Sequence, residues 1–405
     1  MNTTSTGPNP TPVRKLAVVA LGSLGNLCGT AFLYSVGIFM GPLKADLGWS
    51  STEISVNLTI IGVIAFFTSP FAGLLVDRLG PRLIGLVGIA GYFCAFFGLS
   101  FAGRSIWTWW LAAVPLGFAA VLVKPTTWAA GVAGLFTKRR GMALGVVIAG
   151  ASLGSAVWPV IANRLIESLG WRGAYQTLAV TASLIMLPLL FFFYRPSPAS
   201  ERSHQKGWMS AEARKTLRTG RFVRMLSAGF IVTACATACV VHLVPILVSH
   251  GVTRDEAAQF AALIGIASLV SRLATGPLLD YIHGGRLGLV TFTLPVVACL
   301  SLVWAADLGT QAAAISALCI GACIGAEVDI IVYLALRYFG QRDFGFLFGT
   351  IAGTMILGTG TGPLLLSVVH DITGGYTLGL LALVPLFLVA GALIASLGPY
   401  PDLEP

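Results

Sequence analysis

The sequence predicts an all-α membrane protein whose twelve transmembrane helices form two pseudo-symmetric six-helix bundles. Three observations support this fold class. Apolar residues make up 56% of the 405 residues, charged residues only 10%, and the mean hydropathy is +0.86, whereas a water-soluble domain carries about 25% charged residues. Apolar stretches of about 18 or more residues, long enough to cross a hydrocarbon core, recur along the chain. The sequence also repeats itself at an offset of 203 residues.

The repeat divides the chain into two halves of similar size. Gly73-x-x-x-Asp77 recurs as Gly276-x-x-x-Asp280. Four further matches share the offset: Gly48 with Gly251, Glu53 with Glu256, Phe136-x-x-Arg139 with Phe339-x-x-Arg342, and Ala149-Gly150 with Ala352-Gly353. They run without a gap from about residue 42 to 156 against 245 to 359. Two like halves rich in membrane-spanning segments are typical of secondary transporters.

In chain order, six helices are expected in the first half because six apolar segments of spanning length follow one another. They cover 16–40, 52–76, 83–103, 107–135, 141–166 and 172–194. A helix satisfies every backbone polar group within its own segment, as the bilayer interior requires. The polar stretch Met1–Pro12 has no basic n-region, so no cleavable signal is expected. Pro125 is expected to bend the fourth helix.

The second half repeats this arrangement, with helices expected at 222–248, 256–280, 286–306, 310–337, 344–370 and 375–398. The domain organisation follows from these spans. We expect an N-terminal tail at 1–15, a first bundle at 16–194, a linker at 195–221, a second bundle at 222–398 and a tail at 399–405. The 48 glycines suit the close approach of helices in a membrane.

The net charge of +9 comes from an uneven distribution of basic residues. With the N-terminus in the cytoplasm, 18 of the 25 Lys and Arg residues lie in inner segments, eight of them between Arg195 and Arg224. Five lie in outer loops: Lys44, Arg104, Arg164, Arg172 and Arg254. This bias predicts that both termini are cytoplasmic. It favours a basic linker beside anionic lipid headgroups over a nucleic-acid interface.

Neither an enzyme nor a metal or cofactor site is expected. The seven cysteines all lie within predicted spans, form no Cys-x-x-Cys pair and are expected to act as small packing residues. No nucleophile elbow, zincin helix or nucleotide-binding loop is found in the sequence. Without a means of using ATP, uphill transport would have to depend on an ion gradient.

The loop after the second predicted helix carries the most specific motif. It reads Gly73-Leu-Leu-Val-Asp77-Arg78-Leu-Gly80-Pro-Arg82, and the chain here resembles the major facilitator superfamily, whose signature is Gly-x-x-x-Asp-(Arg/Lys)-x-Gly-x-(Arg/Lys). The second copy, ending at Asp280, has Tyr281 in place of the first basic residue. The resemblance implies a gate on the cytoplasmic side, in which the aspartates pair with basic groups of the neighbouring bundle.

Within that superfamily the sequence resembles the monocarboxylate porter and oxalate:formate antiporter group, in its bacterial form. Arg272 stands eight residues before Asp280, as in that group, and the segment from Glu327 to Arg337 is similar to a version common in bacterial members. The span 344–370 has no lysine, and the first helix lacks the lysine of animal monocarboxylate carriers. The resemblance implies an organic anion as substrate and a bacterial inner membrane as location.

Arg272 is the first candidate for substrate binding, because a charge near the bilayer centre normally faces a cavity and has a partner. It lies about 6 Å to the cytoplasmic side of the middle of its helix, at about 1.5 Å per residue. Its planar guanidinium can bind a carboxylate through two hydrogen bonds. The alternative is a structural salt bridge to an acid of the tenth helix, and an exchange of partners would satisfy both.

Lys124 coincides with Glu327 through the 203-residue offset, so one half carries a cation where the other carries an anion. Lys124 is a second candidate for binding the substrate. Glu327 and Asp329 are two residues apart and therefore face different directions on a helix. Either acid is a candidate proton carrier, and the alternative is a static ion pair with Lys124 or Arg272.

Five further residues are weaker candidates. Asn26, Thr30 and Tyr34 recur every four residues, and on a regular helix they would line a pore together. Trp128, one turn beyond Lys124, is a candidate for contact with an aromatic substrate or for core packing. His242 is a candidate proton carrier because histidine titrates near neutrality, or else a residue at the membrane surface.

Together these features predict proton-linked uptake of a small organic monocarboxylate by a monomer that works by alternating access. The partners expected are the organic anion, the proton and the lipid bilayer, with no nucleic acid. One alternative is an organic-anion exchanger or a proton-coupled efflux antiporter of the same fold. Arg272 argues against cationic drugs as substrates. A membrane sensor without transport is less favoured, since 195–224 is too short for an added domain.

Overall fold

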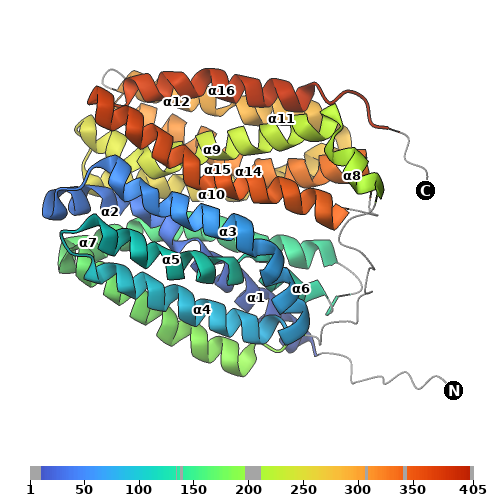
Figure 1. Ribbon diagram of the computed structural model, residues 1–405, viewed down its shortest axis with the longest axis horizontal. Helices are drawn as coiled ribbons and strands as arrows, with labels where there is room; N and C mark the ends of the chain where they lie inside the picture. The colour runs from blue at the N-terminus through green and yellow to red at the C-terminus, as the bar shows by residue number, and fades with distance from the viewer. Residues whose placement is uncertain are drawn as a thin grey trace.

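The computed structural model describes residues 11–133, 135–136, 140–196, 211–305, 309–340 and 344–401. Throughout these ranges the secondary structure is helical, and the helices run side by side in two groups (Figure 1). The first group contains α1 (Pro12–Gly29), α2 (Ala31–Leu47), α3 (Ser51–Leu79), α4 (Pro81–Gly98), η1 (Leu99–Phe101), α5 (Ile106–Leu122), α6 (Pro125–Ala133) and α7 (Arg140–Phe193). The second contains α8 (Ala211–Leu217), α9 (Gly220–Ser249), α10 (Arg254–Tyr281), α11 (Gly284–Thr293), α12 (Pro295–Val303), α14 (Thr310–Phe339), α15 (Phe344–Thr373) and α16 (Thr377–Ala395).

The number of crossings agrees with the prediction once α7 is divided. Among the described residues, eleven segments are long and apolar enough to cross a membrane, and one of them, Gly141–Phe193, has 53 residues. Within it Gly170 adopts φ 70° and ψ 172°, a conformation open to glycine but rarely to other residues. A straight helix of that length would measure about 80 Å, far more than a bilayer core. The segment therefore crosses twice, which gives twelve crossings.

The two halves begin their second crossings in the same way. α3 starts with a capping box in which the Ser50 amide donates to Glu53 Oε2 at 2.8 Å and the Glu53 amide donates to Ser50 Oγ at 3.1 Å. Thr253 and Glu256 form the same box at the start of α10. Such boxes satisfy amides that a helix start leaves free. The repeat of Glu53 and Glu256 in the sequence thus has a local structural cause.

Helix ends define two faces of the molecule. Arg14 of α1 donates from Nε to the carbonyl oxygen of Arg195 at 2.8 Å, and Arg221 of α9 donates to that of Leu397 at 3.2 Å. The start of α1, the end of α7, the start of α9 and the end of α16 therefore lie together, at the right of Figure 1. We call this the inner face and the opposite one, where α3 and α10 begin, the outer face. The linker predicted at 195–221 includes 197–210, outside the described residues.

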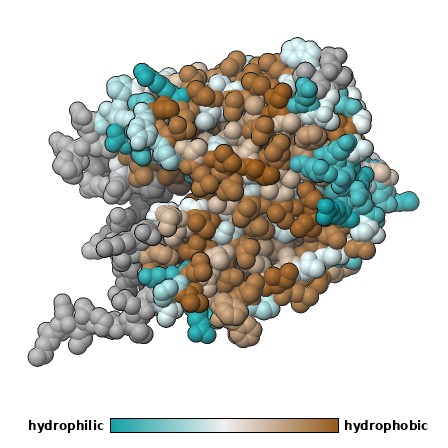
Figure 2. Space-filling model, turned by 180° about the vertical axis from the view of Figure 1, so that it is seen from behind, coloured by the Kyte–Doolittle hydropathy of each residue, from teal (hydrophilic) through white to brown (hydrophobic). Residues whose placement is uncertain are grey.

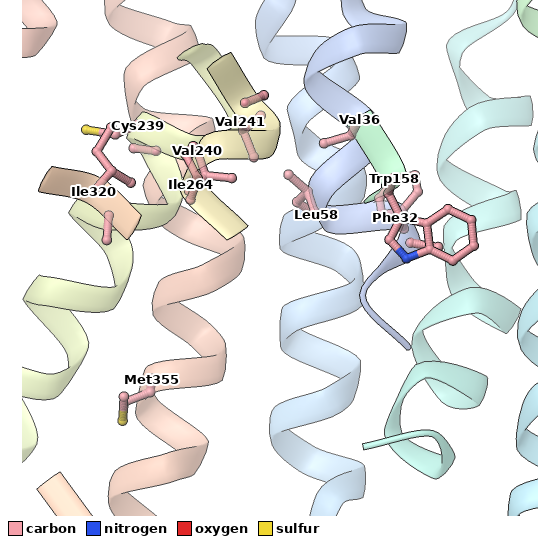
Figure 3. Packing of buried hydrophobic residues seen from close by; sticks show 14 of the residues in the cluster. Phe32, Val36, Leu58, Trp158, Cys239, Val240, Val241, Ile264, Ile320 and Met355 are labelled. Atoms are coloured by element: carbon pink, nitrogen blue, oxygen red, sulfur yellow. The ribbon is translucent and has the colours of Figure 1, made fainter. Parts of the chain in front are cut away.

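Apolar side chains fill the space between the helices and also cover the sides of the molecule. Figure 3 shows buried residues of both halves, among them Phe32 and Leu58 from the first and Val241 and Ile264 from the second. In the first half, the rings of Phe39 and Tyr175 stack with centroids 3.9 Å apart. The visible side is brown across its middle and hydrophilic mainly toward its two ends (Figure 2). This distribution is that of a protein surrounded by lipid.

The halves contact each other from the outer face to mid-depth. Ser55 and Ser367 hydroxyls lie 2.7 Å apart, Thr59 donates to the carbonyl oxygen of Gly360 at 2.8 Å, and the hydroxyls of Ser152 and Ser268 lie 2.9 Å apart. Each contact joins α3 to α15 or α7 to α10. We call these contacts the outer closure.

Glycines mark how close the halves come. A Cβ built on Gly265 of α10 would lie 2.2 Å from the Ala156 nitrogen of α7, and one on Gly37 of α2 would lie 2.2 Å from the Val241 oxygen of α9. Toward the inner face a Cβ on Gly73 of α3 or Gly276 of α10 would meet nothing within 4 Å. The surface in Figure 2 is also hollowed between the halves at its left edge, the inner face. The described residues are therefore closed toward the outer face and open toward the inner face.

Candidate substrate and coupling site

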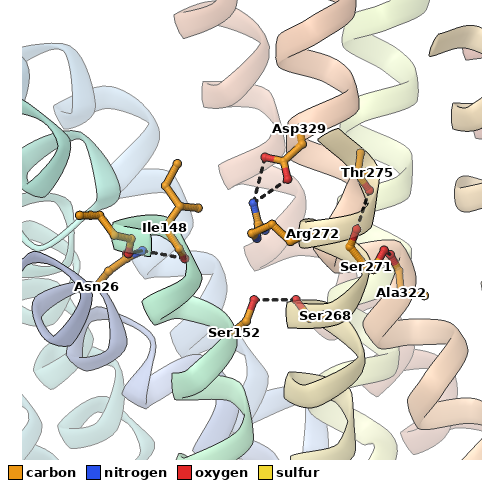
Figure 4. A network of polar contacts seen from close by, with 10 residues as sticks. Asn26, Ile148, Ser152, Ser268, Ser271, Arg272, Thr275, Ala322 and Asp329 are labelled. Atoms are coloured by element: carbon orange, nitrogen blue, oxygen red, sulfur yellow. Dashed lines mark hydrogen bonds and ion pairs between the residues drawn. The ribbon is translucent and has the colours of Figure 1, made fainter. Parts of the chain in front are cut away.

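An ion pair lies between two helices of the second half. Arg272 of α10 donates from Nη1 to both carboxylate oxygens of Asp329 of α14, at 3.0 and 3.1 Å (Figure 4). The Arg272 side chain is 12% exposed and that of Asp329 is 30% exposed. The Arg272 Nε is buried without a hydrogen-bond partner among the described residues. The pair is thus accessible on its carboxylate side, and the guanidinium keeps donors for a second acceptor.

Glu327, one half-turn before Asp329, occupies a more enclosed position. Its side chain is buried, and its Oε2 has no hydrogen-bond partner in the part of the chain that the structure describes. The Arg272 cation and the Thr233 hydroxyl both lie near enough to act on its charge. Tyr34 of the first half shares this environment, because Glu327, Arg272 and Ser155 all act on its hydroxyl. The site therefore draws groups from both halves.

Lys124 lies at the break between α5 and α6. Val123 and Lys124 separate the two helices, and Pro125 starts the second one, so the bend expected at Pro125 is present. The structure gives Lys124 no ion pair and no side-chain hydrogen bond among the described residues. Arg272 is paired with Asp329 rather than Glu327. Of the ion pairs considered for the two acids, the one between Arg272 and Asp329 is present, and the described residues show none for Glu327 or Lys124.

The predicted stripe on the first helix is interrupted. Thr30 separates α1 from α2, and its hydroxyl donates to the carbonyl oxygen of Leu27 at 2.7 Å. Asn26 is buried and donates to the carbonyl oxygens of Val147 and Ile148 at 3.2 and 3.3 Å, which fixes α1 to α7 (Figure 4). The stripe was expected on a regular helix, and the break at Thr30 removes that regularity. Of the three residues, Tyr34 is the one near enough to Arg272 and Glu327 to interact with their charges.

Trp128 belongs to the packing of the first half in this structure. Its ring is fully buried, and a Cβ on Gly25 or Gly85 would lie within 3 Å of it. Its indole nitrogen donates to the carbonyl oxygen of Val123 at 2.9 Å. Of the two roles considered for Trp128, this environment matches core packing. We therefore do not carry it forward as a substrate-binding residue.

His242 is buried in the outer half of α9 rather than exposed at the membrane surface. Its Nε2 lies 3.0 Å from the carbonyl oxygen of Pro363 and 3.1 Å from Ser367 Oγ. Since Ser367 also meets Ser55 of the first half, His242 is joined to the outer closure. Its Nδ1 has no partner within the described residues. His242 stands apart from the Arg272–Asp329 pair and supports the contact between halves.

One charged residue that joins the halves near the outer face was not predicted from the sequence. Asp371, near the outer end of α15, accepts from the amides of Ser51 and Thr52 at 3.3 and 2.7 Å. It thereby caps α3 from the opposite half, where a carboxylate is favoured by the helix dipole. An acid close to an outer helix end was the available signal. The serines of the outer closure gave no such signal in the sequence, because small hydroxyl residues are common in membrane helices.

The predicted gating residues lie near the inner face, where the halves are apart. Gly73, Arg78 and Asp280 are exposed, and Arg82 lies over the Phe191 ring with 5.6 Å to its centroid. The side chain of Asp77 lies outside the described residues. No ion pair across the inner gate is found among the residues that are described. A gate formed by these residues remains a prediction for the conformation that is closed toward the inner face.

Metal binding has no support in the described ranges, where no group of three His, Cys, Asp or Glu side chains is arranged for a metal ion. The cysteines are free, and five of the seven are buried. What the site offers is one cation paired with a partly exposed acid, a second acid whose Oε2 has no hydrogen-bond partner among the described residues, and a nearby tyrosine from the other half. Such a site can bind an anion and hold a proton.

Two inverted or repeated helix bundles around charges at mid-depth define a secondary transporter. Residues 22–342 match the Major Facilitator Superfamily, and the chain belongs to this family, whose members transport solutes and are not enzymes. The predicted all-α membrane fold of this superfamily is thus confirmed. A crystal structure of a mutant of the nucleoside transporter NupG is similar, with a TM-score of 0.79, 11% identity and coverage of 95% of this chain and 99% of that one.

Curated relatives are distant. An MFS-type transporter of Aspergillus fumigatus is 25% identical over 88% of this chain and 87% of its own length. The agnestins efflux protein of Paecilomyces divaricatus is 25% identical over 84% and 77%. Monocarboxylate transporter 13 of Rattus norvegicus is 26% identical over 90% and 82%. The family supports a multi-pass membrane location. These three relatives are eukaryotic, and a bacterial inner membrane stays a prediction.

Proposed function

We propose that this transporter carries a small organic monocarboxylate together with a proton, in the uptake direction. The observation that carries the proposal is the Arg272–Asp329 pair, because it is buried on its cationic side and partly exposed on its anionic side. Similarity to monocarboxylate transporters supports the substrate class. The proposal assigns the substrate carboxylate to Arg272 and the coupling proton to Asp329 or Glu327.

Charge balance gives the mechanism. In the empty carrier Arg272 and Asp329 neutralise each other. When a substrate carboxylate takes the place of Asp329 on the guanidinium, Asp329 is left charged and unpaired, which is costly at this depth. A proton on Asp329 removes that cost, so substrate and proton bind together. The site has the same net charge empty and loaded, and both forms can change conformation.

Tyr34 and Lys124 have supporting roles in this proposal. Tyr34 reaches Arg272 and Glu327 from the first half, so binding at the pair can be sensed by both bundles. Lys124 is a cation without an ion pair among the described residues and would attract an anion toward the inner opening. Glu327 is the alternative site for the coupling proton, since a buried carboxylate without an ion pair is more stable when protonated.

Uptake into proteoliposomes tests the proposal. Labelled acetate, lactate and benzoate should accumulate when the outside is made acidic, and a protonophore should abolish the accumulation. Empty liposomes control for passive entry of the protonated acids, and a neutral amide of each acid controls for substrate charge. Equal uptake with and without the gradient, after subtraction of the empty-liposome signal, would remove the proton from the mechanism.

Anion exchange is the second candidate. A proton-coupled efflux antiporter of the same fold is the other alternative, and the name of one relative, an efflux protein, supports it. The same ion pair serves anion exchange if a second anion, rather than a proton, replaces the departing substrate. Counterflow separates the two functions. Exchange predicts rapid uptake only into liposomes preloaded with an acid, regardless of the pH gradient.

A further inference from the structure

A second group of basic side chains lies at the outer face, on the opposite side of the outer closure from Arg272. A pocket of about 260 Å³ opens there between α2 and α9. Three basic side chains line it: Lys44 of α2, Arg254 of α10 and His370 of α15. The remaining wall is apolar or carries hydroxyl groups, as in Ile38 and Tyr376. None of the described residues that line the pocket is acidic.

The basic groups of this pocket are not neutralised by neighbouring acids. Lys44 donates from Nζ to Ser51 Oγ at 3.0 Å, and neither Lys44 nor Arg254 forms an ion pair among the described residues. His370 Nδ1 is buried without a hydrogen-bond partner in the same ranges. Lys44 and Asp371 both lie near enough to His370 to act on its imidazole electrostatically, so the fixed positive charge of the pocket comes from Lys44 and Arg254.

The acidic residues that follow His370 and Arg254 in the sequence form hydrogen bonds outside the pocket. Asp371 follows His370, but its carboxylate accepts from the backbone amides at the start of α3. Asp255 follows Arg254 and accepts from Gln259 at 2.9 Å, while Glu256 is engaged in its capping box. The pocket therefore keeps an excess of positive charge together with free N–H donors. Enclosed cations of this kind concentrate anions from solution and bind oxyanions through charge-assisted hydrogen bonds.

Both bundles build the pocket. Lys44 comes from the first half, and Arg254 and His370 come from the second. Beside it, Gly37 of α2 lies so close to α9 that an added Cβ would be 2.2 Å from the Val241 oxygen. Lys44 and Arg254, with the His370 imidazole beside them, can surround one ligand only while the two halves remain together. Occupancy is therefore linked to the outer closure.

We propose that this outer pocket is a second anion site, which binds a small oxyanion such as an organic carboxylate or phosphate and stabilises the conformation closed toward the outer face. An anion that binds one conformation better shifts the population toward it. External oxyanion would then slow the return of the binding site to the outside. The inference goes beyond the proposed function, because it needs neither a proton nor binding at Arg272.

Binding is measured on the full-length protein in nanodiscs of zwitterionic lipid, by calorimetric titration with benzoate, acetate and inorganic phosphate. The Arg272→Gln background removes the proposed central anchor. We expect residual binding in this background, and a loss of about ten- to a hundredfold in affinity when Lys44→Gln and Arg254→Gln are added. Lys44→Arg keeps the charge and should keep the binding. Arg164→Gln, at an exposed arginine predicted on the same face, is the matched control.

Two results would overturn the proposal: no residual binding in Arg272→Gln, or residual binding that Lys44→Gln with Arg254→Gln leaves unchanged. The source of the anion is tested by repeating the titration in nanodiscs with phosphatidylglycerol. Competition by that lipid identifies a headgroup as the occupant, whereas unchanged affinity identifies a free anion. In proteoliposomes, external phosphate should slow benzoate uptake by the wild type but not by the Lys44→Gln, Arg254→Gln variant. Equal inhibition of both would remove the link to the outer closure.

Discussion

Arg272 is joined to one of two available acids, and the choice determines what each acid can do. Asp329 holds both oxygens toward Nη1 at 3.0 and 3.1 Å, while Glu327 is left in a buried position without a partner for Oε2. The first acid is suited to exchange places with a substrate. The second is suited to hold a proton throughout the cycle or to give it up late.

Arg272→Lys tests the geometry of the anchor. An ammonium keeps the charge but loses the planar fork that matches a carboxylate, so substrate affinity should fall about 30- to 1000-fold, equivalent to about 2–4 kcal/mol. Ligand-induced shifts in melting temperature measure this loss. If Arg272 instead serves only to neutralise Asp329, Arg272→Ala should lower the melting temperature without ligand, and adding Asp329→Asn should restore it. Undiminished acid binding by well-folded Arg272→Ala would remove the anchor.

Glu327→Gln tests the second acid. The amide has almost the shape of the protonated carboxyl group and cannot release a proton. If Glu327 carries the coupling proton, the variant should retain counterflow at near wild-type rates and lose accumulation driven by the pH gradient. Asp329→Asn is the matched comparison, and it should show the same split if Asp329 is the carrier. A Glu327→Gln protein that still accumulates acid against its gradient would leave the role to Asp329.

The sequence indicated the charges of this site but not their pairing. The spacing of Glu327 and Asp329 shows that they face different directions, yet it does not show which of them faces α10. That depends on the rotation of α14 in the packed bundle, and hence on contacts between residues far apart in the chain. For the same reason Asn26 was expected in a pore and lies against α7, and Trp128 lies in the core.

At the scale of helices, the apolar spans predicted the crossings well because hydrophobic length alone specifies them. Interruptions within a crossing were harder to predict. Pro125 predicted the break between α5 and α6, whereas the break at Thr30 has no proline near it. It coincides with Gly29, where an added Cβ would lie 2.8 Å from the Val123 oxygen. Both the low helix propensity of glycine and this close approach to Val123 favour a break at that position.

Asp371 offers a test of how helices hold the outer closure. Asp371→Asn removes the charge that caps α3, and a hydrogen bond to a charged group is worth about 1.5–3 kcal/mol. The population open toward the outer face should rise about ten- to a hundredfold relative to the closed one. Distances between spin labels on the outer ends of α5 and α16 measure the shift. Ser367→Ala, which removes a neutral contact, should have a smaller effect, and equal shifts in the two variants would argue against the charge.

For the whole molecule, two glycines of one helix report on opposite conformations. Gly265→Ala would place a methyl group against the backbone of α7, so it should destabilise the closure toward the outer face. Gly276→Ala meets nothing in this conformation and should leave its stability unchanged, but it should hinder closure toward the inner face. The side from which a membrane-impermeant thiol reagent reaches a cysteine placed at the central site distinguishes the two. Identical accessibility in both variants would contradict this assignment.

Much of the overall architecture was predictable because the two halves of the sequence repeat the same residues at the same helix ends. Gly48 and Gly251 adopt φ 73° and 86°, and a capping box follows each of them. These local structures explain the repeated residues better than any role in transport. The conformation was not predictable, since both the closed and the open outer face must be compatible with one sequence.

The capping boxes have a consequence for biogenesis. Each half carries its own capping box at the start of its second crossing. The side chains that join the halves in the outer closure are mostly small and neutral, and Asp371 is the charged exception. A half leaving the ribosome therefore has what it needs to insert and fold before its counterpart is made. Two fragments divided within 197–210 and produced together should reassemble into a transport-competent pair, detectable by co-purification and benzoate uptake. Failure of either fragment to insert by itself would show that one bundle serves as the template for the other.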